Sequence, residues 1–217
     1  MSLEFLSPGA AALARSPMER QAVAAGARLE RRDGWNVAVG FDTPEADLCR
    51  STVGFADLSH VGKVELHGAQ PGELELGRAT RAEGAWWLPY TPQRSLALCE
   101  PGELPGLIER FGDRAVDVTT AFGALALKGP LARELLARFC ALDLRDAATP
   151  VHAFRPGSVA RTPGAVLRQA EDRWLMLFGA ALGQYMWTVV ADAAESLGGG
   201  PVGVDALTRV EQEPSRA

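Results

Sequence analysis

Apolar and polar residues alternate in several short stretches of this chain, and alternation with a period of two is typical of half-buried strands. In VGKVELHG, residues 61–68, Val64 and Leu66 alternate with charged and polar positions. Further strands are predicted at GWNVAVGF (34–41), RSLALC (94–99), RAVDVTT (114–120), GALALK (123–128), GAVLRQ (164–169) and RWLMLFG (173–179). The chain therefore contains many short strands.

Helical spacing of apolar residues lies between these strands. It is clearest in GPLARELLARFC, where Pro130 suits a first helical turn and one face carries Leu131, Leu135, Leu136 and Phe139. Similar spacing predicts helices from Pro17 to the charged run before Gly34, and at residues 44–51, 103–112 and 182–197. Segments 69–92 and 142–164 are rich in loop-forming residues and receive no assignment.

The order of these elements predicts an α+β fold with a mixed or antiparallel sheet, because strand pairs alternate with helices without regular βαβ units. We expect one module over residues 16–217, built from two similar halves of about 16–120 and 121–217. The Ala, Pro, Gly and Ser content of residues 1–15 predicts a flexible N-terminus.

Composition excludes several classes of function. Lys and Arg total 22 against 27 Asp and Glu, and no basic stripe interleaved with aromatic residues occurs, which argues against nucleic-acid binding. No apolar run approaches the roughly 18 residues of a membrane span, and the start does not resemble a signal peptide, so we expect a cytoplasmic protein without membrane contact. Cys49, Cys99 and Cys140 are widely spaced, which predicts reduced thiols and no metal site.

Asp57, Ser59 and His60 stand close together in the segment FADLSH. Near neighbours in an extended or turning chain point in different directions, so these residues do not form a catalytic triad. Two interpretations remain: the side-chain oxygens hold a turn, or the turn lines a ligand site. Trp86 and Trp87 are likewise either core residues or a flat surface for a ligand.

Four segments, in order, carry a family resemblance: SPMERQAVAAGARLERRDGWNVAVGF, VGFADLSHVGKVELHG, ALKGPLARELLARFCALDL and PVGVDAL. Together they resemble the tetrahydrofolate-dependent aminomethyltransferases, the T-protein of the glycine cleavage system and its relatives. The resemblance covers most of residues 16–207. It implies an α+β fold of two ferredoxin-like halves around a central folate pocket. The sequence ends at Ala217, where full-length relatives continue, so we expect no C-terminal barrel.

The same resemblance indicates which functional residues are present. Family enzymes carry a catalytic aspartate in an I-D-D-L segment, and the stretch matched to it here, EPGELPGLIE, offers only Glu100 and Glu103 nearby, so no catalytic residue is assigned. The resemblance implies a tetrahydrofolate pocket in which the DLSH turn meets the VLRQAEDRW segment. The residues expected at its wall are Asp57, His60, Arg168, Glu171 and Trp174.

In length and in its second half, VDVTTAFGALALKGPLARELLARFCALDLR, the chain most resembles the gamma subunits of heterotetrameric sarcosine oxidases. This implies a non-catalytic module that binds a tetrahydrofolate-type ligand, serves as a subunit of a larger oxidase, or does both. The alternative is a free-standing aminomethyl or one-carbon transferase with a glycine-cleavage-type partner. An iron–sulfur maintenance role is disfavoured because the K-G-C-Y-x-G-Q-E motif of that branch is absent.

Overall fold

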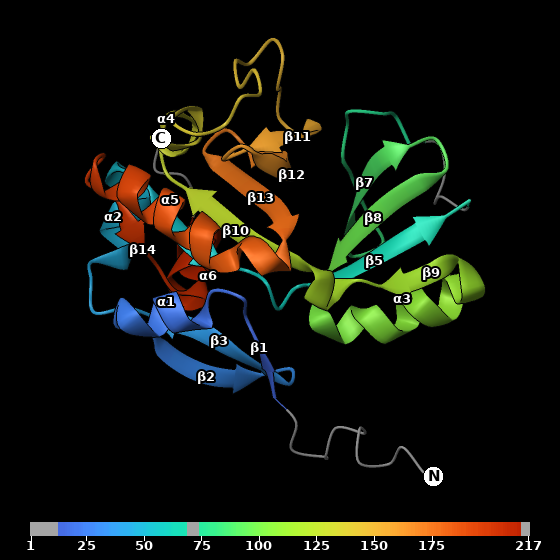
Figure 1. The fold of residues 1–217 in the computed structure, drawn as a ribbon, viewed down its shortest axis with the longest axis horizontal. Coiled ribbons are helices and arrows are strands. Elements are labelled where there is room, and N and C mark those ends of the chain that lie inside the picture. Colours follow the sequence, from blue (N-terminus) through green and yellow to red (C-terminus); the bar gives the residue numbers. More distant parts are fainter. Residues whose placement is uncertain (1–12, 69–73, 214–217) are drawn as a thin grey trace.

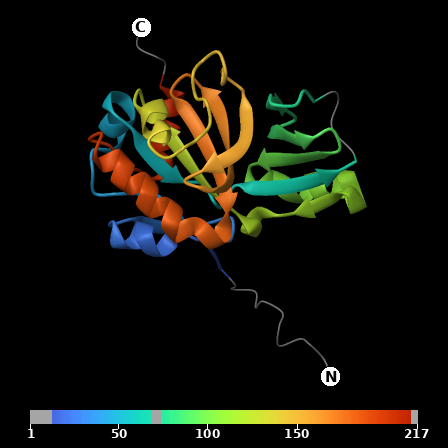
Figure 2. The ribbon, with the colours of Figure 1, turned by 45° about the horizontal axis from the view of Figure 1, so that its top comes forward.

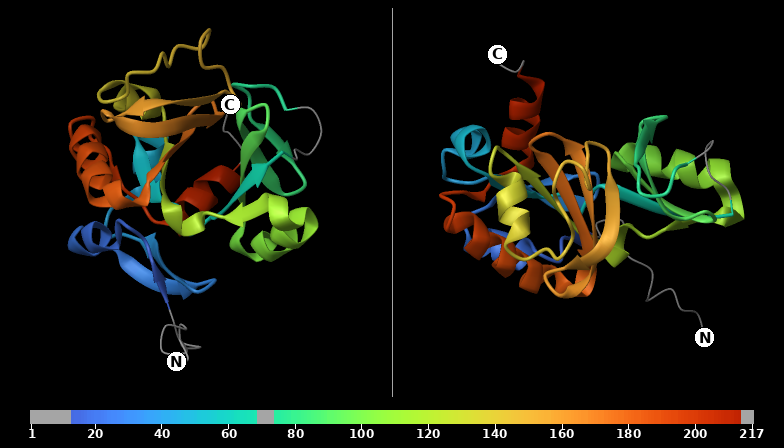
Figure 3. Two further views of the ribbon diagram at one scale, coloured as in Figure 1. Left: turned by 45° about the vertical axis from the view of Figure 1, so that its right-hand side comes forward. Right: turned by 90° about the horizontal axis from the view of Figure 1, so that it is seen from above.

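The computed structural model describes residues 13–68 and 74–213. Within them the chain forms three sheets, and the two larger sheets face each other in the middle of the molecule (Figure 1). Helices cover the outer faces of both larger sheets (Figures 2 and 3). The third, smaller sheet lies beside the larger helical layer, near the start of the described chain.

The six-stranded sheet has the order β11-β12-β13-β10-β4-β14. Its strands are β4 Gly54–Asp57, β10 Phe122–Lys128, β11 Phe154–Val159, β12 Thr162–Ala170, β13 Arg173–Gly179 and β14 Gly200–Pro201. All neighbours pair antiparallel except β14 with β4. Strand β4 comes from the first half of the sequence and pairs with β10, so the two sequence halves share this sheet.

The five-stranded sheet has the order β6-β7-β8-β5-β9 and is antiparallel throughout. Its strands are β5 Gly62–His67, β6 Thr80–Ala82, β7 Ala85–Thr91, β8 Arg94–Cys99 and β9 Ala115–Asp117. Helix α3, Leu104–Phe111, covers its outer face, where Val64 and Leu66 are fully buried. The alternation seen in residues 61–68 therefore places its apolar side against a helix.

The three-stranded sheet has the order β1-β3-β2, with β1 Ala14–Arg15, β2 Arg28–Arg32 and β3 Trp35–Gly40. The remaining helices are α1 Glu19–Ala24, α2 Glu45–Ser51, α4 Ala132–Ala137, α5 Gly183–Glu195 and α6 Val204–Gln212. Short 3-10 turns occupy Pro101–Glu103, Gly112–Arg114, Thr119–Ala121 and Ala180–Leu182. No helix within the described residues is long and apolar enough to cross a membrane.

Two cores lie on opposite faces of the six-stranded sheet. On the helix-covered face, Leu135 and Leu136 of α4 pack with Trp174 and Met176 of β13. On the other face, Leu175 and Leu177 join side chains of β7 and β8 from the five-stranded sheet. Successive residues of β13 therefore belong to different cores, as the pleat of a strand requires.

A glycine permits the close approach of α6 to the three-stranded sheet. A Cβ atom on Gly203 would lie 2.1 Å from the carbonyl carbon of Val39, a distance that no side chain tolerates. The Gly203 N–H donates to Glu45 Oε1 at 2.6 Å, and the same oxygen accepts from the N–H of Phe41 at 2.9 Å. The PVGVDAL segment is thus held at a point where only glycine fits.

The α+β prediction is confirmed, and none of the three sheets formed by the described residues closes into a barrel. The helix predicted from Pro17 to Gly34 is wrong in its second part, because α1 ends at Ala24 and Gly26 adopts a φ of 87°, which reverses the chain into β2. The unassigned segments contain β6, β7 and β11. Residues 1–12 of the expected flexible N-terminus lie outside the described residues, whereas Ala14 and Arg15 form β1.

Candidate functional site

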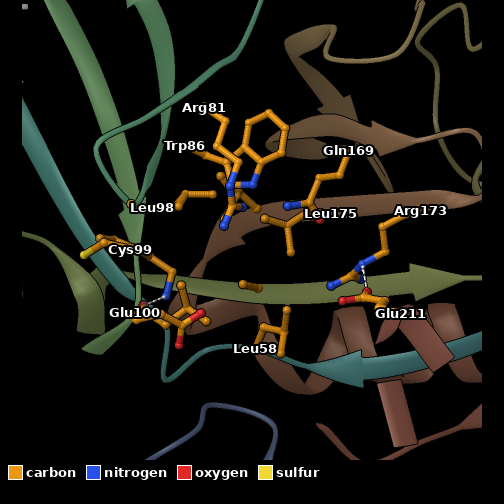
Figure 4. A pocket seen from close by; sticks show the side chains of 15 residues that line it. Leu58, Arg81, Trp86, Leu98, Cys99, Glu100, Gln169, Arg173, Leu175 and Glu211 are labelled. Carbon is orange, nitrogen blue, oxygen red and sulfur yellow. Dashed lines mark hydrogen bonds and ion pairs between the residues drawn. The ribbon is translucent and has the colours of Figure 1, made fainter. Parts of the chain in front are cut away.

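A cavity of about 220 Å³ lies where the two larger sheets face each other (Figure 4). Six regions of the described chain supply its wall: the β4–β5 segment, the β6–β7 hairpin, the end of β8, β10, the β12–β13 hairpin and α6. The lining residues are Leu58, Val61, Lys63, Arg81, Gly84, Trp86, Leu98, Cys99, Glu100, Ala124, Gln169, Arg173, Leu175, Leu177 and Glu211. Its apolar wall is therefore an extension of the core between the sheets.

A buried ammonium group lies at one side of this cavity. Lys63, at the start of β5, is fully buried, and its Nζ donates to the carbonyl oxygens of Ser59 at 3.0 Å and Val61 at 2.7 Å. Burial lowers the pKa of Lys63 to about 8, and the charges of Asp57 and Asp117 oppose this shift. The described contacts of its Nζ are therefore with carbonyl oxygens of the β4–β5 turn.

A buried guanidinium group lines the cavity from β13. Arg173 is 8% exposed, and its Nε donates to Glu211 Oε1 of α6 at 2.6 Å (Figure 4). Its Nη1 is buried and has no hydrogen-bond partner among the described residues, and the same is true of Gln169 Oε1. Polar atoms that are buried without a partner are uncommon and costly, so these two point to a missing partner.

An aromatic wall faces these polar groups. Trp86 of β7 lines the cavity and is almost completely buried. The guanidinium carbon of Arg81 lies 5.6 Å from the centre of its ring, within the range of a cation–π contact. Trp87, the next residue, points to the opposite side of the strand and is a core residue against α3. Of the two tryptophans, only Trp86 is therefore placed to contact a ligand.

The carboxylates of the cavity wall are at its rim. Glu211 is held by Arg173, and Glu100 is exposed at the end of β8. Glu103 is exposed and does not belong to the described lining residues. A proton acceptor in catalysis must reach the reacting group, so a buried, unpaired carboxylate would be the expected arrangement. The described wall has none, and the described residues contain no cluster that could hold a metal ion.

None of the five predicted site residues is among the described lining residues of the cavity. Their chain neighbours take that place: Leu58, Val61, Gln169, Arg173 and Leu175. The two predicted segments therefore do meet across a central cavity. A strand exposes alternate residues to its two faces, so the side of β13 that carries Trp174 is the side that lies against the helices.

Asp57 and His60 have partners away from the cavity. Asp57 accepts hydrogen bonds from the Ser16 hydroxyl and, at 2.9 Å, from the Ser59 N–H. Burial raises the pKa of Asp57, and these hydrogen bonds oppose the shift. Burial lowers the pKa of His60 to about 4, and the charge of Lys63 adds to this effect. The DLSH segment is thus a turn held by its own side chains, and its cavity contacts come from Leu58 and Val61.

Arg168, Glu171 and Trp174 form a group on the helix-covered side of the sheet. Arg168 donates to Asp146 Oδ1 at 2.5 Å and to Glu171 Oε2 at 2.7 Å. Trp174 is fully buried, and its indole N–H has no partner among the described residues. The Glu171 side chain is 84% exposed. The role of these residues in ligand binding stays a prediction.

The residues that sequence reasoning missed are Lys63, Gln169 and Arg173. Each of these residues stands in a predicted strand or hairpin among apolar residues. A charged or polar residue at such a position usually points into solvent, so the pattern alone does not indicate a site. Here that side of the strand meets another sheet.

Comparisons with known proteins find relatives of this chain in sequence and in fold. The family described as GCVT N-terminal domain matches residues 108–214. Aminomethyltransferases from Frankia alni (strain DSM 45986 / CECT 9034 / ACN14a) and Moorella thermoacetica (strain ATCC 39073 / JCM 9320) are 25% and 26% identical over 242 and 241 residues. Both alignments cover 93% of this chain and 64% of the curated relative. The chain is therefore similar to proteins of the glycine cleavage T-protein superfamily.

Two solved structures share the T-protein fold. The aminomethyltransferase T of the glycine cleavage system from Bartonella henselae matches with a TM-score of 0.73 and 16% identity, over 89% of this chain and 60% of that chain. A chain of the heterotetrameric sarcosine oxidase from Corynebacterium sp. U-96 matches with a TM-score of 0.64 and 20% identity, over 88% of this chain and 99% of that chain. This T-protein relative thus spans almost all of an oxidase chain and about three fifths of a transferase.

Proposed function

We propose that this chain is a non-catalytic T-protein-like module that serves as a subunit of a larger amine-oxidising complex in the cytoplasm. The observation that carries the proposal is the extent of the match. The alignment spans 99% of a chain taken from a heterotetrameric sarcosine oxidase, but 64% of the curated aminomethyltransferases. The match along nearly the whole of that oxidase chain supports a subunit role.

The charges of the cavity support the absence of catalysis. Its buried basic groups among the described residues are Lys63 and Arg173, whereas the carboxylates of Glu100 and Glu211 are more exposed. Aminomethyl transfer needs a group that accepts or directs a proton near the folate amine. The Lys63 Nζ in this wall is engaged as a hydrogen-bond donor to the carbonyl oxygens of Ser59 and Val61.

An activity assay tests this part of the proposal. We expect the purified chain to show no aminomethyl transfer with tetrahydrofolate and a lipoyl carrier protein. Turnover that disappears in Glu100→Gln would contradict the proposal and favour the free-standing transferase with a glycine-cleavage-type partner. Glu103→Gln is the matched control, since this carboxylate is exposed and does not belong to the described cavity wall.

Tetrahydrofolate binding is a second candidate function, favoured by the flat face of Trp86 in a central cavity. Ligand pockets usually measure about 300–1,000 Å³, so a cavity of about 220 Å³ has room for the ring system of a folate and not for the whole molecule. Titration calorimetry with tetrahydrofolate tests it. Binding in this cavity would weaken in Trp86→Leu and stay unchanged in Glu171→Ala. If Glu171→Ala abolishes binding, the ligand lies at the predicted residues instead.

A further inference from the structure

We propose that the end of α6, residues 208–213, is a salt-sensitive cover of the central cavity, and that it opens beside Arg173. The inference goes beyond the proposed subunit role and does not depend on it. It rests on the contacts of α6, which are close packing in its first half and mainly ion pairs at its end.

The first half of α6 is fixed by close packing. Val204, Ala206 and Leu207 are buried, and Leu207 belongs to the core between the two larger sheets. Directly before the helix, Gly203 lies so close to the backbone of Val39 that no side chain fits there. This half of the helix has no room to move, so an opening has to begin after Leu207.

The end of α6 is held mainly by two ion pairs. Val210 is its one apolar side chain, and it is only partly buried. Glu211 pairs with Arg173 of β13 at 2.6 Å, and Glu213 pairs with Arg50 of α2 at 2.5 Å. In the right-hand view of Figure 3, this end of the helix projects past the neighbouring elements. Little apolar surface therefore holds it in place.

The Glu213–Arg50 pair makes this attachment sensitive to salt. Its two side chains are 47% and 45% exposed, and ion pairs between exposed side chains are weak and are screened by dissolved salt. The Glu211–Arg173 pair is more buried and is screened less. Salt therefore weakens the outer of the two ion pairs that oppose opening.

Opening at this place uncovers one wall of the cavity. Glu211 and Arg173 both line the cavity (Figure 4). The Arg173 side chain is 10% exposed and the Glu211 side chain 40%, so the carboxylate lies on the solvent side of the guanidinium. Arg173 Nη1 is buried without a partner among the described residues, which is a cost of the closed state. Opening hydrates this group instead of leaving a buried charge unpaired.

Hydrogen exchange on the full chain tests the inference. We expect a rise from about 0.05 to about 0.5 M NaCl to speed amide exchange in residues 208–213 by roughly two- to fivefold, without a change in β10. NMR of the Arg173 Nε–H, assigned through its loss in Arg173→Lys, should show the same increase, because Glu211 accepts this proton in the closed state. Glu213→Gln at low salt should speed both exchange rates in the same way.

Asp143→Asn is the matched control. Asp143 pairs with Arg145 at 2.5 Å, and its side chain is 41% exposed against 47% for Glu213. This variant should leave both exchange rates unchanged.

Exchange in residues 208–213 that responds neither to salt nor to Glu213→Gln would overturn the inference. Faster amide exchange with an unchanged Arg173 Nε–H would also overturn it, because the helix end would then fray without opening the cavity. An equal increase in β10 would indicate global destabilisation and refute a local cover. Because these measurements use the isolated chain, their failure would leave the proposed subunit role untouched.

Discussion

The guanidinium carbon of Arg168 lies 5.1 Å from the centre of the Trp174 ring, across the register of β12 and β13. Both side chains are buried on the helix-covered side of the six-stranded sheet, away from the central cavity. Arg168 also holds the loop before β11, through Asp146 and the carbonyl oxygen of Thr149 at 2.9 Å. The pair stabilises this part of the fold.

Arg168→Met should lower the free energy of unfolding by about 1–3 kcal/mol. The side chain is 4% exposed, and its loss removes the contacts to Asp146, Thr149 and Glu171 together. Arg133→Met is the matched control because Arg133 contacts the same Asp146 at 3.4 Å from an exposed position, where an ion pair contributes about 0–1 kcal/mol. Urea unfolding of both variants measures the difference. Equal losses would show that the buried network contributes no more than a surface contact.

Gly203→Ala should destabilise the chain by about 2–4 kcal/mol or prevent folding, because the new methyl group meets the backbone of Val39 and Gly40 at 2.1–2.2 Å. Backbone atoms of a paired strand have little freedom to move away. Gly106→Ala provides the opposite case, since nothing lies within 4 Å of its added Cβ in α3, and it should stabilise by roughly 0.5–1 kcal/mol. Thermal unfolding that ranks the two variants the other way would contradict the packing at Gly203.

His60 should make the folded state sensitive to acid. Its pKa falls from 6.5 in the unfolded chain to about 4 in the folded chain, mainly through burial. Between these values the unfolded state binds the extra proton, so stability is full above pH 6.5 and decreases as the pH falls toward 4. One pKa unit corresponds to about 1.4 kcal/mol, which limits the effect to about 3.5 kcal/mol.

The test for His60 is the difference in unfolding free energy between pH 7.5 and pH 4.5 in the unmutated chain and in His60→Asn. We expect the decrease at low pH to be smaller in the variant. The buried Asp57 has a raised pKa and therefore acts in the opposite direction, but it is present in both proteins. An identical pH dependence would mean that His60 titrates equally in both states.

Local patterns predicted the elements well where they were strong. The alternation of Val64 and Leu66 gave β5, and the spacing of Leu135 and Leu136 gave α4, with all four side chains fully buried. The predicted end of the first helix was wrong because a single residue, Gly26, reverses the chain. Strand β7 was not predicted because its sequence AWWLPYT lacks a simple alternation of apolar and polar residues. In those places tertiary packing overrides local preference.

The predicted segments contribute neighbouring residues to the cavity wall, and the binding role of the predicted residues themselves stays a prediction. The alternation predicts that Trp174 and Leu175 point to opposite faces of the sheet. It does not predict which face packs against helices and which face packs against the second sheet. That choice depends on how β7 and β8 pack on β10 and β13, which are distant in sequence. Lys63 and Arg173 line one cavity only through this packing, so no local pattern could assign them to the same site.

Affinity capture of the tagged chain from the cells in which it naturally occurs tests the subunit proposal most directly. We expect it to retain partner chains in fixed proportion, and the retained complex to consume oxygen when sarcosine or a related secondary amine is added. The same capture with Gly203→Ala, whose fold should be disrupted, should retain neither the partners nor the activity. A chain that is recovered alone, as a monomer, and that transfers an aminomethyl group to tetrahydrofolate would contradict the proposal.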